Sequence, residues 1–170
     1  MRRRGFLAVT AAAAWARAQT AGGRTWSKLD FLLGKWTGVA GDKDTPLGAG
    51  QGDFSFELQL DRKIMVRRSY AEYRSAPRHD DLMVIYSDAP NEAPRAIYFD
   101  SEGHVIHYNL MFPKANAVVF ESDGTQPGPR YRLSYWLERA VLHGKFEVAP
   151  PGGEYKGYMS WTSTRKDSRR

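Results

Sequence analysis

Hydrophobic and polar residues alternate along most of the chain beyond residue 34. In one clear segment, apolar side chains occupy every second position and polar side chains fill the positions between them: Phe54, Phe56, Leu58 and Leu60. A period of two predicts half-buried β-strands rather than helices. Ten such segments are predicted, near residues 36–40, 52–60, 63–73, 82–87, 95–100, 104–112, 117–122, 131–137, 141–148 and 155–165.

Turn-forming residues separate these segments at short intervals, as at 61–62, 101–103 and 150–153. Short connections join successive strands as hairpins, and closing the sheet into a ring removes its exposed edges. We therefore predict an all-β fold, an up-and-down antiparallel barrel of about ten strands, with a β-sandwich as the alternative. Before the first strand, three leucines at helical spacing predict a short helix from Ser27 to Leu33 that closes one end.

The first 18 residues are typical of an export signal. A basic start (Met1–Arg4) precedes a short alanine-rich apolar run, and Ala16-Arg17-Ala18 supplies small residues for cleavage before Gln19. Arg3-Arg4-Gly5-Phe6-Leu7 resembles a twin-arginine signal; general secretion and a retained amphipathic helix are the alternatives. The apolar run of about 11 residues is shorter than the roughly 20 of a membrane-spanning helix.

We accordingly expect a periplasmic or secreted protein with no integral membrane segment after signal removal. The expected divisions are a signal peptide (1–18), a leader (19–26), the barrel domain (27–166) and a basic tail (167–170).

The net charge of +6 at first suggests a nucleic-acid or membrane partner. The excess of positive over negative charge lies at the two ends. Residues 1–18 contain four arginines and no acid, and residues 165–170 carry a net +3. The remaining residues, 19–164, have a net charge of −1, so we expect no nucleic-acid partner. The chain has no cysteine, which excludes disulfides, thiolate metal sites and cysteine nucleophiles. The sequence does not indicate an oligomeric state.

In several predicted strands, tyrosines occupy the same alternating positions as the apolar residues, and so face the same side of the sheet. An arginine facing a barrel lumen needs an anionic or hydroxyl partner, and the lumen of such a barrel could bind a small apolar or amphipathic molecule, including a carboxylate. The alternative is an aromatic core with Arg67 or Arg68 paired on the outer surface. The predicted ligand-binding residues are Arg68, Tyr70, Tyr86, Tyr98, Tyr108 and Tyr135.

Among the four histidines, His104 lies just across a three-residue hairpin from Asp100. This pair could transfer a proton at the barrel mouth, or it could simply stabilise the hairpin through a hydrogen bond. His79, beside Asp80 and Asp81, has no further ligand nearby in the sequence, so we expect a solvated loop and no metal site.

Residues 31–38, with Gly34-Lys35-Trp36 entering the first predicted strand, resemble the opening of calycin proteins such as lipocalins and fatty-acid-binding proteins. The resemblance implies that Gly34 and Trp36 help to close the barrel and that Arg165 packs on the Trp36 ring. Residues 79–86, 98–104 and 127–132 also look similar to small exported bacterial calycin-like domains with no assigned activity.

Calycin resemblance leaves several functions open. Fatty-acid-binding barrels use arginine and tyrosine to bind ligands, whereas calycin-like phenolic-acid decarboxylases use similar residue types as acids and bases. Nitrobindin-type barrels bind haem through a late-strand histidine; here the last glycine of their motif is shifted to Gly41 and His143 is the one late candidate. We expect a lumen-binding protein without a cofactor. The alternatives are a lyase, hydratase or isomerase for a small organic acid, a haem-binding barrel, and a structural domain that binds a protein partner.

Overall fold

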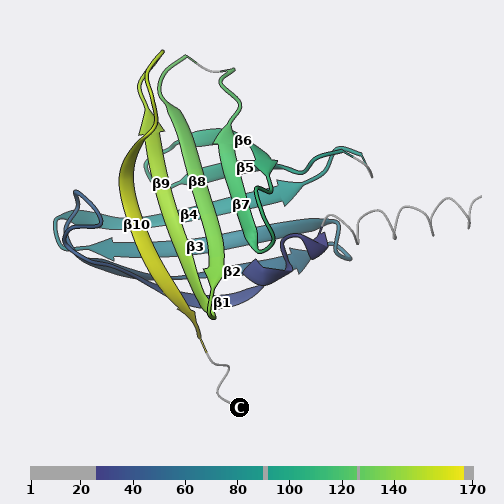
Figure 1. The fold of residues 1–170 in the computed structure, drawn as a ribbon, viewed down its shortest axis with the longest axis horizontal. Helices are drawn as coiled ribbons and strands as arrows, with labels where there is room; N and C mark the ends of the chain where they lie inside the picture. The colour runs from purple at the N-terminus through teal and green to yellow at the C-terminus, as the bar shows by residue number, and fades with distance from the viewer. Residues whose placement is uncertain (1–25, 90–91, 126, 167–170) are drawn as a thin grey trace, which may run out of the picture.

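Ten antiparallel strands form a closed ring in the computed structural model, which describes residues 26–89, 92–125 and 127–166 (Figure 1). Each strand pairs with its neighbours in sequence, and β1 pairs with β10 to close the ring. This confirms the predicted up-and-down barrel and excludes the sandwich. The strands are β1 (Gly34–Ala40), β2 (Gly50–Gln59), β3 (Ile64–Tyr73), β4 (Ala76–Tyr86), β5 (Arg95–Asp100), β6 (Val105–Met111), β7 (Ala117–Ser122), β8 (Arg130–Glu138), β9 (Val141–Ala149) and β10 (Lys156–Arg165).

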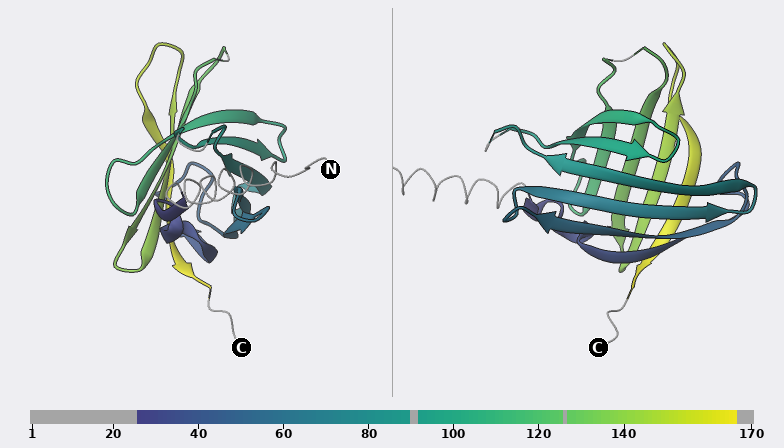
Figure 2. Two further views of the ribbon diagram at one scale, coloured as in Figure 1. Left: turned by 90° about the vertical axis from the view of Figure 1, so that its right-hand side faces the viewer. Right: turned by 180° about the vertical axis from the view of Figure 1, so that it is seen from behind.

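The barrel consists of two crossed layers. In Figure 1, β7–β10 run steeply across the front, whereas β2–β6 run nearly horizontally behind them. The reverse view in Figure 2 shows the strands of this rear layer side by side. The interior between the layers contains the hydrophobic core near one end and the cavity described below near the other.

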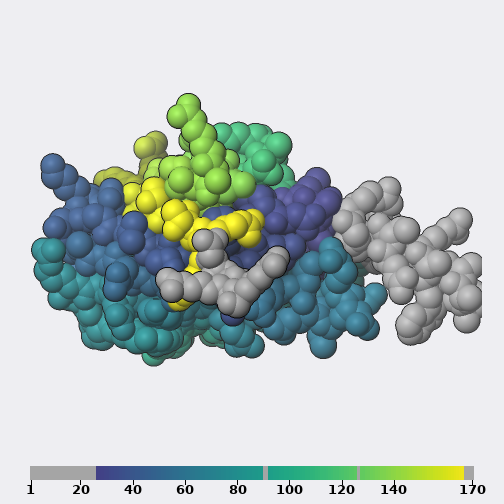
Figure 3. Space-filling model, turned by 90° about the horizontal axis from the view of Figure 1, so that it is seen from below, coloured from purple at the N-terminus to yellow at the C-terminus, as the bar shows by residue number. Residues whose placement is uncertain are grey.

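The ring closes where β10 meets β1. Trp36 pairs with Arg165 and Val39 with Thr162, so the last strand lies antiparallel to the first. Figure 3 shows β10, in yellow, against the purple and blue N-terminal strands. Closure therefore joins the two ends of the strand sequence and leaves no unpaired edge in the described sheet.

Arg165 links the junction between β1 and β10 to the segment that precedes β1. Its guanidinium lies 4.4 Å from the centroid of the fully buried Trp36 ring and donates a 2.6 Å hydrogen bond to the Leu33 carbonyl. Gly34 adopts φ +112°, and a Cβ there would come within 2.7 Å of Arg165 Nη1. The contact that the calycin resemblance implied between Trp36 and Arg165 is thus present, and glycine at position 34 gives it room.

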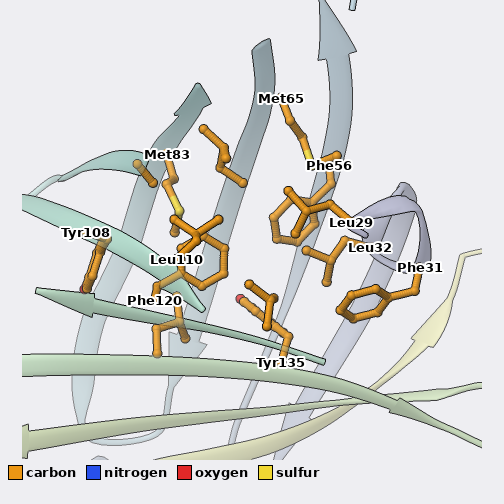
Figure 4. Close-up of a cluster of buried hydrophobic side chains, with 14 of the residues drawn as sticks. Leu29, Phe31, Leu32, Phe56, Met65, Met83, Tyr108, Leu110, Phe120 and Tyr135 are labelled. Atoms are coloured by element: carbon orange, nitrogen blue, oxygen red, sulfur yellow. The ribbon is translucent and has the colours of Figure 1, made fainter. Parts of the chain in front are cut away.

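A three-residue 3₁₀ helix, η1 (Asp30–Leu32), replaces the longer helix predicted from Ser27 to Leu33. Leu29 and Leu32 are fully buried, and Trp36 Nε1 donates a hydrogen bond to the Leu32 carbonyl. Figure 4 shows Leu29, Phe31 and Leu32 in the same buried cluster as Phe56 and Tyr135. The segment that leads into β1 at Gly34 therefore packs these side chains in the core.

Strand bounds agree closely with those predicted, except for β4. It begins at Ala76, six residues before the predicted start. Ala76 and residues 79–81 pair with β3, and Asp81 also pairs with Asp100 of β5. In the described part of the chain, no helix is long and apolar enough to cross a membrane. The predicted signal peptide (1–18), most of the leader and the tail (167–170) lie outside the described residues.

Candidate functional site

A cavity of about 540 Å³ occupies the end of the barrel opposite η1. It is bounded by the ends of β1, β3 and β5 and the beginnings of β2, β4 and β10, together with Leu47 of the β1–β2 loop. One wall is mainly apolar and aromatic and comes from β8–β10: Tyr131, Leu133, Phe146, Val148, Met159 and Trp161. The opposite wall is polar and comes from β3–β5 and the β5–β6 turn: Arg67, Ser69, His79, Asp81, Tyr98, Asp100, Glu102 and His104. The cavity therefore has two chemically different sides.

Arg67 and Asp81 form a buried ion pair on the polar wall. Their side chains are 8% and 6% exposed, respectively, and Arg67 Nη1 donates to Asp81 Oδ1. Arg67 Nη2 also donates to the Ser69 hydroxyl at 3.1 Å, and the guanidinium lies 5.5 Å from the Phe54 ring centroid. Burial by itself would lower the pKa of Arg67, but the Asp81 carboxylate, together with Tyr135 and Tyr98, raises the pKa above its ordinary value. The pair is therefore ionised and already internally compensated.

His79 continues this network toward the mouth. Its Nε2 lies 2.9 Å from the Tyr98 hydroxyl and 3.7 Å from Asp81 Oδ2, and its Nδ1 lies 2.7 Å from Glu102 Oε2. The His79 ring and the Tyr98 hydroxyl share one hydrogen bond, whose direction depends on the tautomer of the ring. When the ring is protonated, its Nδ1 forms an ion pair with the Glu102 carboxylate. Contacts between Tyr98, His79 and Glu102 thus run from the cavity to its rim.

Asp100 and His104 interact as the sequence suggested. His104 Nδ1 lies 2.8 Å from Asp100 Oδ2, while Asp100 Oδ1 accepts the backbone N–H groups of Glu102 and His104. Burial by itself would raise the pKa of Asp100, but these hydrogen bonds from His104 lower it below its ordinary value. The His104 side chain is 58% exposed. The pair both stabilises the β5–β6 hairpin and places an ionised carboxylate at the cavity mouth.

Three potential metal-ligand atoms meet at this mouth. His79, Asp100 and Glu102 each offer one atom, and these atoms lie within 4.8 Å of one another. A mixed nitrogen and oxygen set of this kind could hold a divalent cation. Asp80, considered from sequence as the neighbour of His79, is directed elsewhere and makes a double hydrogen bond with Arg78.

The tyrosines at the site are neutral hydrogen-bonding groups. Burial raises the pKa of both Tyr98 and Tyr108, which line the cavity. Tyr135 is 1% exposed and lies in the core cluster (Figure 4), where burial raises its pKa to about 12 while the nearby Arg67 charge opposes the shift. Tyr98 and Tyr108 thus occupy the lumen, as predicted, and Tyr135 packs within the core.

Two predicted lumen residues lie elsewhere. Arg68 is exposed on the outer face of β3, and Tyr86 does not line the cavity. Tyr70 borders the cavity, but its hydroxyl donates to Asp53 and Arg78 covers its ring at 4.0 Å, so the end of its side chain is engaged by polar partners. The predicted lumen positions of Arg68 and Tyr86 are therefore wrong. Residues 64–66 and 82–86 are continuous apolar runs, so alternation alone does not show which side chains of β3 and β4 face the lumen.

Sequence reasoning also missed the polar wall itself. The sequence predicts a solvated loop at His79 and Asp81, whereas both residues face the cavity from the first half of β4. Arg67 shares its parity with Met65, which is fully buried, and this was the one available signal for its inward position. Glu102 carried no signal, because hairpin turns commonly contain a solvated glutamate.

The histidine that the nitrobindin resemblance would use for haem is placed unfavourably. The His143 ring stacks on Trp136 at 5.1 Å, and neither residue lines the cavity. Among the described residues of β7–β10, no histidine faces the cavity. The late strands do not offer an axial ligand to a lumenal haem, so these residues do not fit the nitrobindin arrangement.

Comparison with known proteins gives the fold and no more. No protein-family model and no curated protein matches the chain. Fourteen chains of solved structures match, among them Rv2717c from M. tuberculosis, which is 11% identical with a TM-score of 0.58. That alignment covers 84% of this chain and 98% of Rv2717c. At this identity the likeness concerns the barrel architecture alone.

Proposed function

We propose that the chain is an exported, lipocalin-like barrel that binds one small amphipathic molecule in its lumen. The observation that carries the proposal is the cavity of about 540 Å³, with an apolar aromatic wall facing a polar wall. Its volume lies within the range of roughly 300–1,000 Å³ that is typical of small-molecule sites. A barrel whose function is purely structural has no need of an opening that core side chains could fill.

The polar groups at the site are already positioned by contacts with one another. The Arg67–Asp81 pair, the bond between His79 and Tyr98, and the bond between Asp100 and His104 fix side chains on three neighbouring elements. Such preorganisation lowers the entropy lost on binding. The twin-arginine-like pattern at residues 3–7, within the expected signal peptide of residues 1–18, supports a site of action in the periplasm or outside the cell.

The proposal is tested by native mass spectrometry of the protein purified from the envelope or medium of its own cells. We expect a population heavier than the mature chain by one small molecule, and loss of that molecule after mild denaturation. An ultraviolet–visible spectrum of the same sample examines the haem alternative, which predicts a strong Soret band. Its absence beside a retained colourless molecule supports the proposed ligand site.

A second candidate function is acid–base catalysis in the same cavity. It is favoured by two histidine–carboxylate pairs at the mouth, His79–Glu102 at 2.7 Å and His104–Asp100 at 2.8 Å. A panel of small hydratable, isomerisable and decarboxylatable compounds followed by NMR tests it. Turnover must be lost in His79→Gln and kept in His107→Gln, because His107 does not line the cavity. Lack of turnover across the panel would leave binding as the better description.

A further inference from the structure

Among the ionisable side chains that line the cavity, carboxylates outnumber permanently positive groups. Apart from tyrosines, the lining residues with acidic or basic side chains are three carboxylates, two histidines and one arginine: Asp81, Asp100, Glu102, His79, His104 and Arg67. In the described part of the chain, no lysine lines the cavity and no arginine other than Arg67 does. The cation that would have to receive an anionic ligand is thus Arg67.

Arg67 is already engaged. Asp81 balances its charge, Ser69 accepts from Nη2, and the Phe54 ring lies beside the guanidinium. With both partners more than nine-tenths buried, replacing Asp81 by a ligand carboxylate would leave the Asp81 charge without a counter-ion in a poorly solvated site. The ion pair therefore presents the cavity with a neutral unit.

Asp100 and Glu102 lack such compensation. Their ring partners, His104 and His79, carry charge only when protonated. With neutral histidines the cavity mouth has a net charge of −2, and it remains negative when one histidine is protonated. This potential repels carboxylates and attracts a cationic group.

The wall across the cavity has the opposite chemistry. Leu133, Phe146 and Trp161 present apolar and aromatic surface, and none of the residues that β8–β10 contribute to the lining is charged. An apolar body can therefore pack on β8–β10 while a polar group reaches the carboxylates at the mouth. Both halves of the ligand are then defined by the residues they face.

We infer that the ligand is a small amphipathic amine, with its apolar body against β8–β10 and its protonated nitrogen beside Asp100 and Glu102. This inference rests on the proposed lumen-binding function and refines it. It also reverses the expectation of a carboxylate ligand, because the arginine that would have bound a carboxylate is neutralised by Asp81.

Three probes of equal chain length test the inference: octylamine, 1-octanol and octanoate. Each competes with the neutral fluorophore N-phenyl-1-naphthylamine at pH 7.5 in low salt, with EDTA present to remove metal ions. We expect octylamine to bind about tenfold more tightly than 1-octanol, and octanoate to bind most weakly. Octanoate binding as tightly as octylamine would overturn the amine assignment while leaving the lumen site in place. Failure of the fluorophore and all three probes to bind would overturn the lumen site itself.

Two matched variants test whether the preference for octylamine arises at the cavity mouth. Glu102→Gln removes one mouth carboxylate and should reduce the preference for octylamine over 1-octanol by about fivefold to tenfold. Asp80→Asn is the matched control. Asp80 adjoins Asp81 on β4, which pairs with Asp100 on β5, but the Asp80 carboxylate accepts a hydrogen bond from Arg78 and does not line the cavity. An equal loss in both variants would show that overall charge, and not the mouth, determines the preference.

Discussion

Arg67 and Asp81 face each other across adjacent strands and neutralise each other at the wall of the cavity. Ser69, two residues beyond Arg67 on β3, is the residue that pairs with Asp81 on β4, so the two charged side chains meet diagonally. The pair places two opposite charges inside the barrel, and neither charge is free to bind a ligand. Its energetics and its effect on ligand choice can be measured separately.

Asp81→Asn should destabilise the barrel severely. The variant leaves the Arg67 guanidinium buried without its counter-ion, a change that typically costs about 3–5 kcal/mol. Urea denaturation followed by tryptophan fluorescence gives the free energy of unfolding. The double variant Arg67→Met, Asp81→Leu should recover most of the loss, since it removes both charges. A double variant as unstable as Asp81→Asn would show that the contact is needed for reasons other than charge balance.

Arg165→Ala should weaken closure of the ring. It removes the cation–π contact with Trp36 and the hydrogen bond to the Leu33 carbonyl. We expect a loss of about 1–2 kcal/mol in the free energy of unfolding. Lys35→Ala on the exposed face of β1 is the control and should change stability by less than about 0.5 kcal/mol. Equal effects of the two substitutions would remove Arg165 from the closure of the barrel.

Gly144→Ala should disturb the cavity wall. A Cβ at position 144 would overlap the Trp161 indole, which lines the cavity, so the ring must move. Overpacking of this kind costs about 1–3 kcal/mol, and we expect weaker binding of N-phenyl-1-naphthylamine as well. Gly157→Ala is the matched control, because its nearest non-neighbouring atom would be Lys145 Cε at 3.8 Å. Wild-type binding by Gly144→Ala would contradict the placement of Trp161 at the ligand site.

Glu147 should make stability depend on pH in the acid range. Arg132 and Lys145 hold its carboxylate at 2.8 and 2.7 Å, and the hydrogen bond from Arg132 is the main reason that its pKa falls below the ordinary 4.5. Because the folded pKa is the lower one, the contribution is fully present above the unfolded pKa and is lost as pH falls through the folded pKa. The free energy of unfolding measured from pH 7 to pH 3 should therefore decline less steeply in Glu147→Gln. Glu57→Gln, at an exposed position on β2, should follow the wild-type slope.

The barrel could be predicted from sequence because its determinants are local. Alternation such as that from Phe54 to Leu60 sets each strand, turn residues set each hairpin, and ten hairpin-linked strands must close to bury their edges. The Trp36–Arg165 contact could be predicted from the calycin resemblance of the first and last strands. The Asp100–His104 contact was accessible because the two residues are four apart on one hairpin.

The polar wall could not be predicted because pairing between strands creates it. Residues 76–81 carry proline and four charged or ionisable side chains, and pairing with β3, together with the Asp81–Asp100 pair to β5, makes them a strand. That extension turns His79 and Asp81 inward. Likewise, the choice between Arg67 and Arg68 required knowing which of the two would meet Asp81, a residue that the sequence suggested was in solvent.

The central claim, that the cavity holds the ligand, is tested most directly by filling it. Ile106 lines the cavity, whereas its neighbour Val105 is exposed on the other face of β6, so Ile106→Trp and Val105→Trp add the same side chain inside and outside the lumen. The measurement is a fluorescence titration with N-phenyl-1-naphthylamine, with circular dichroism to verify that each variant is folded. We predict saturable one-to-one binding by the wild type and Val105→Trp, and at least about tenfold weaker binding by Ile106→Trp. Undiminished binding by a folded Ile106→Trp would contradict the account.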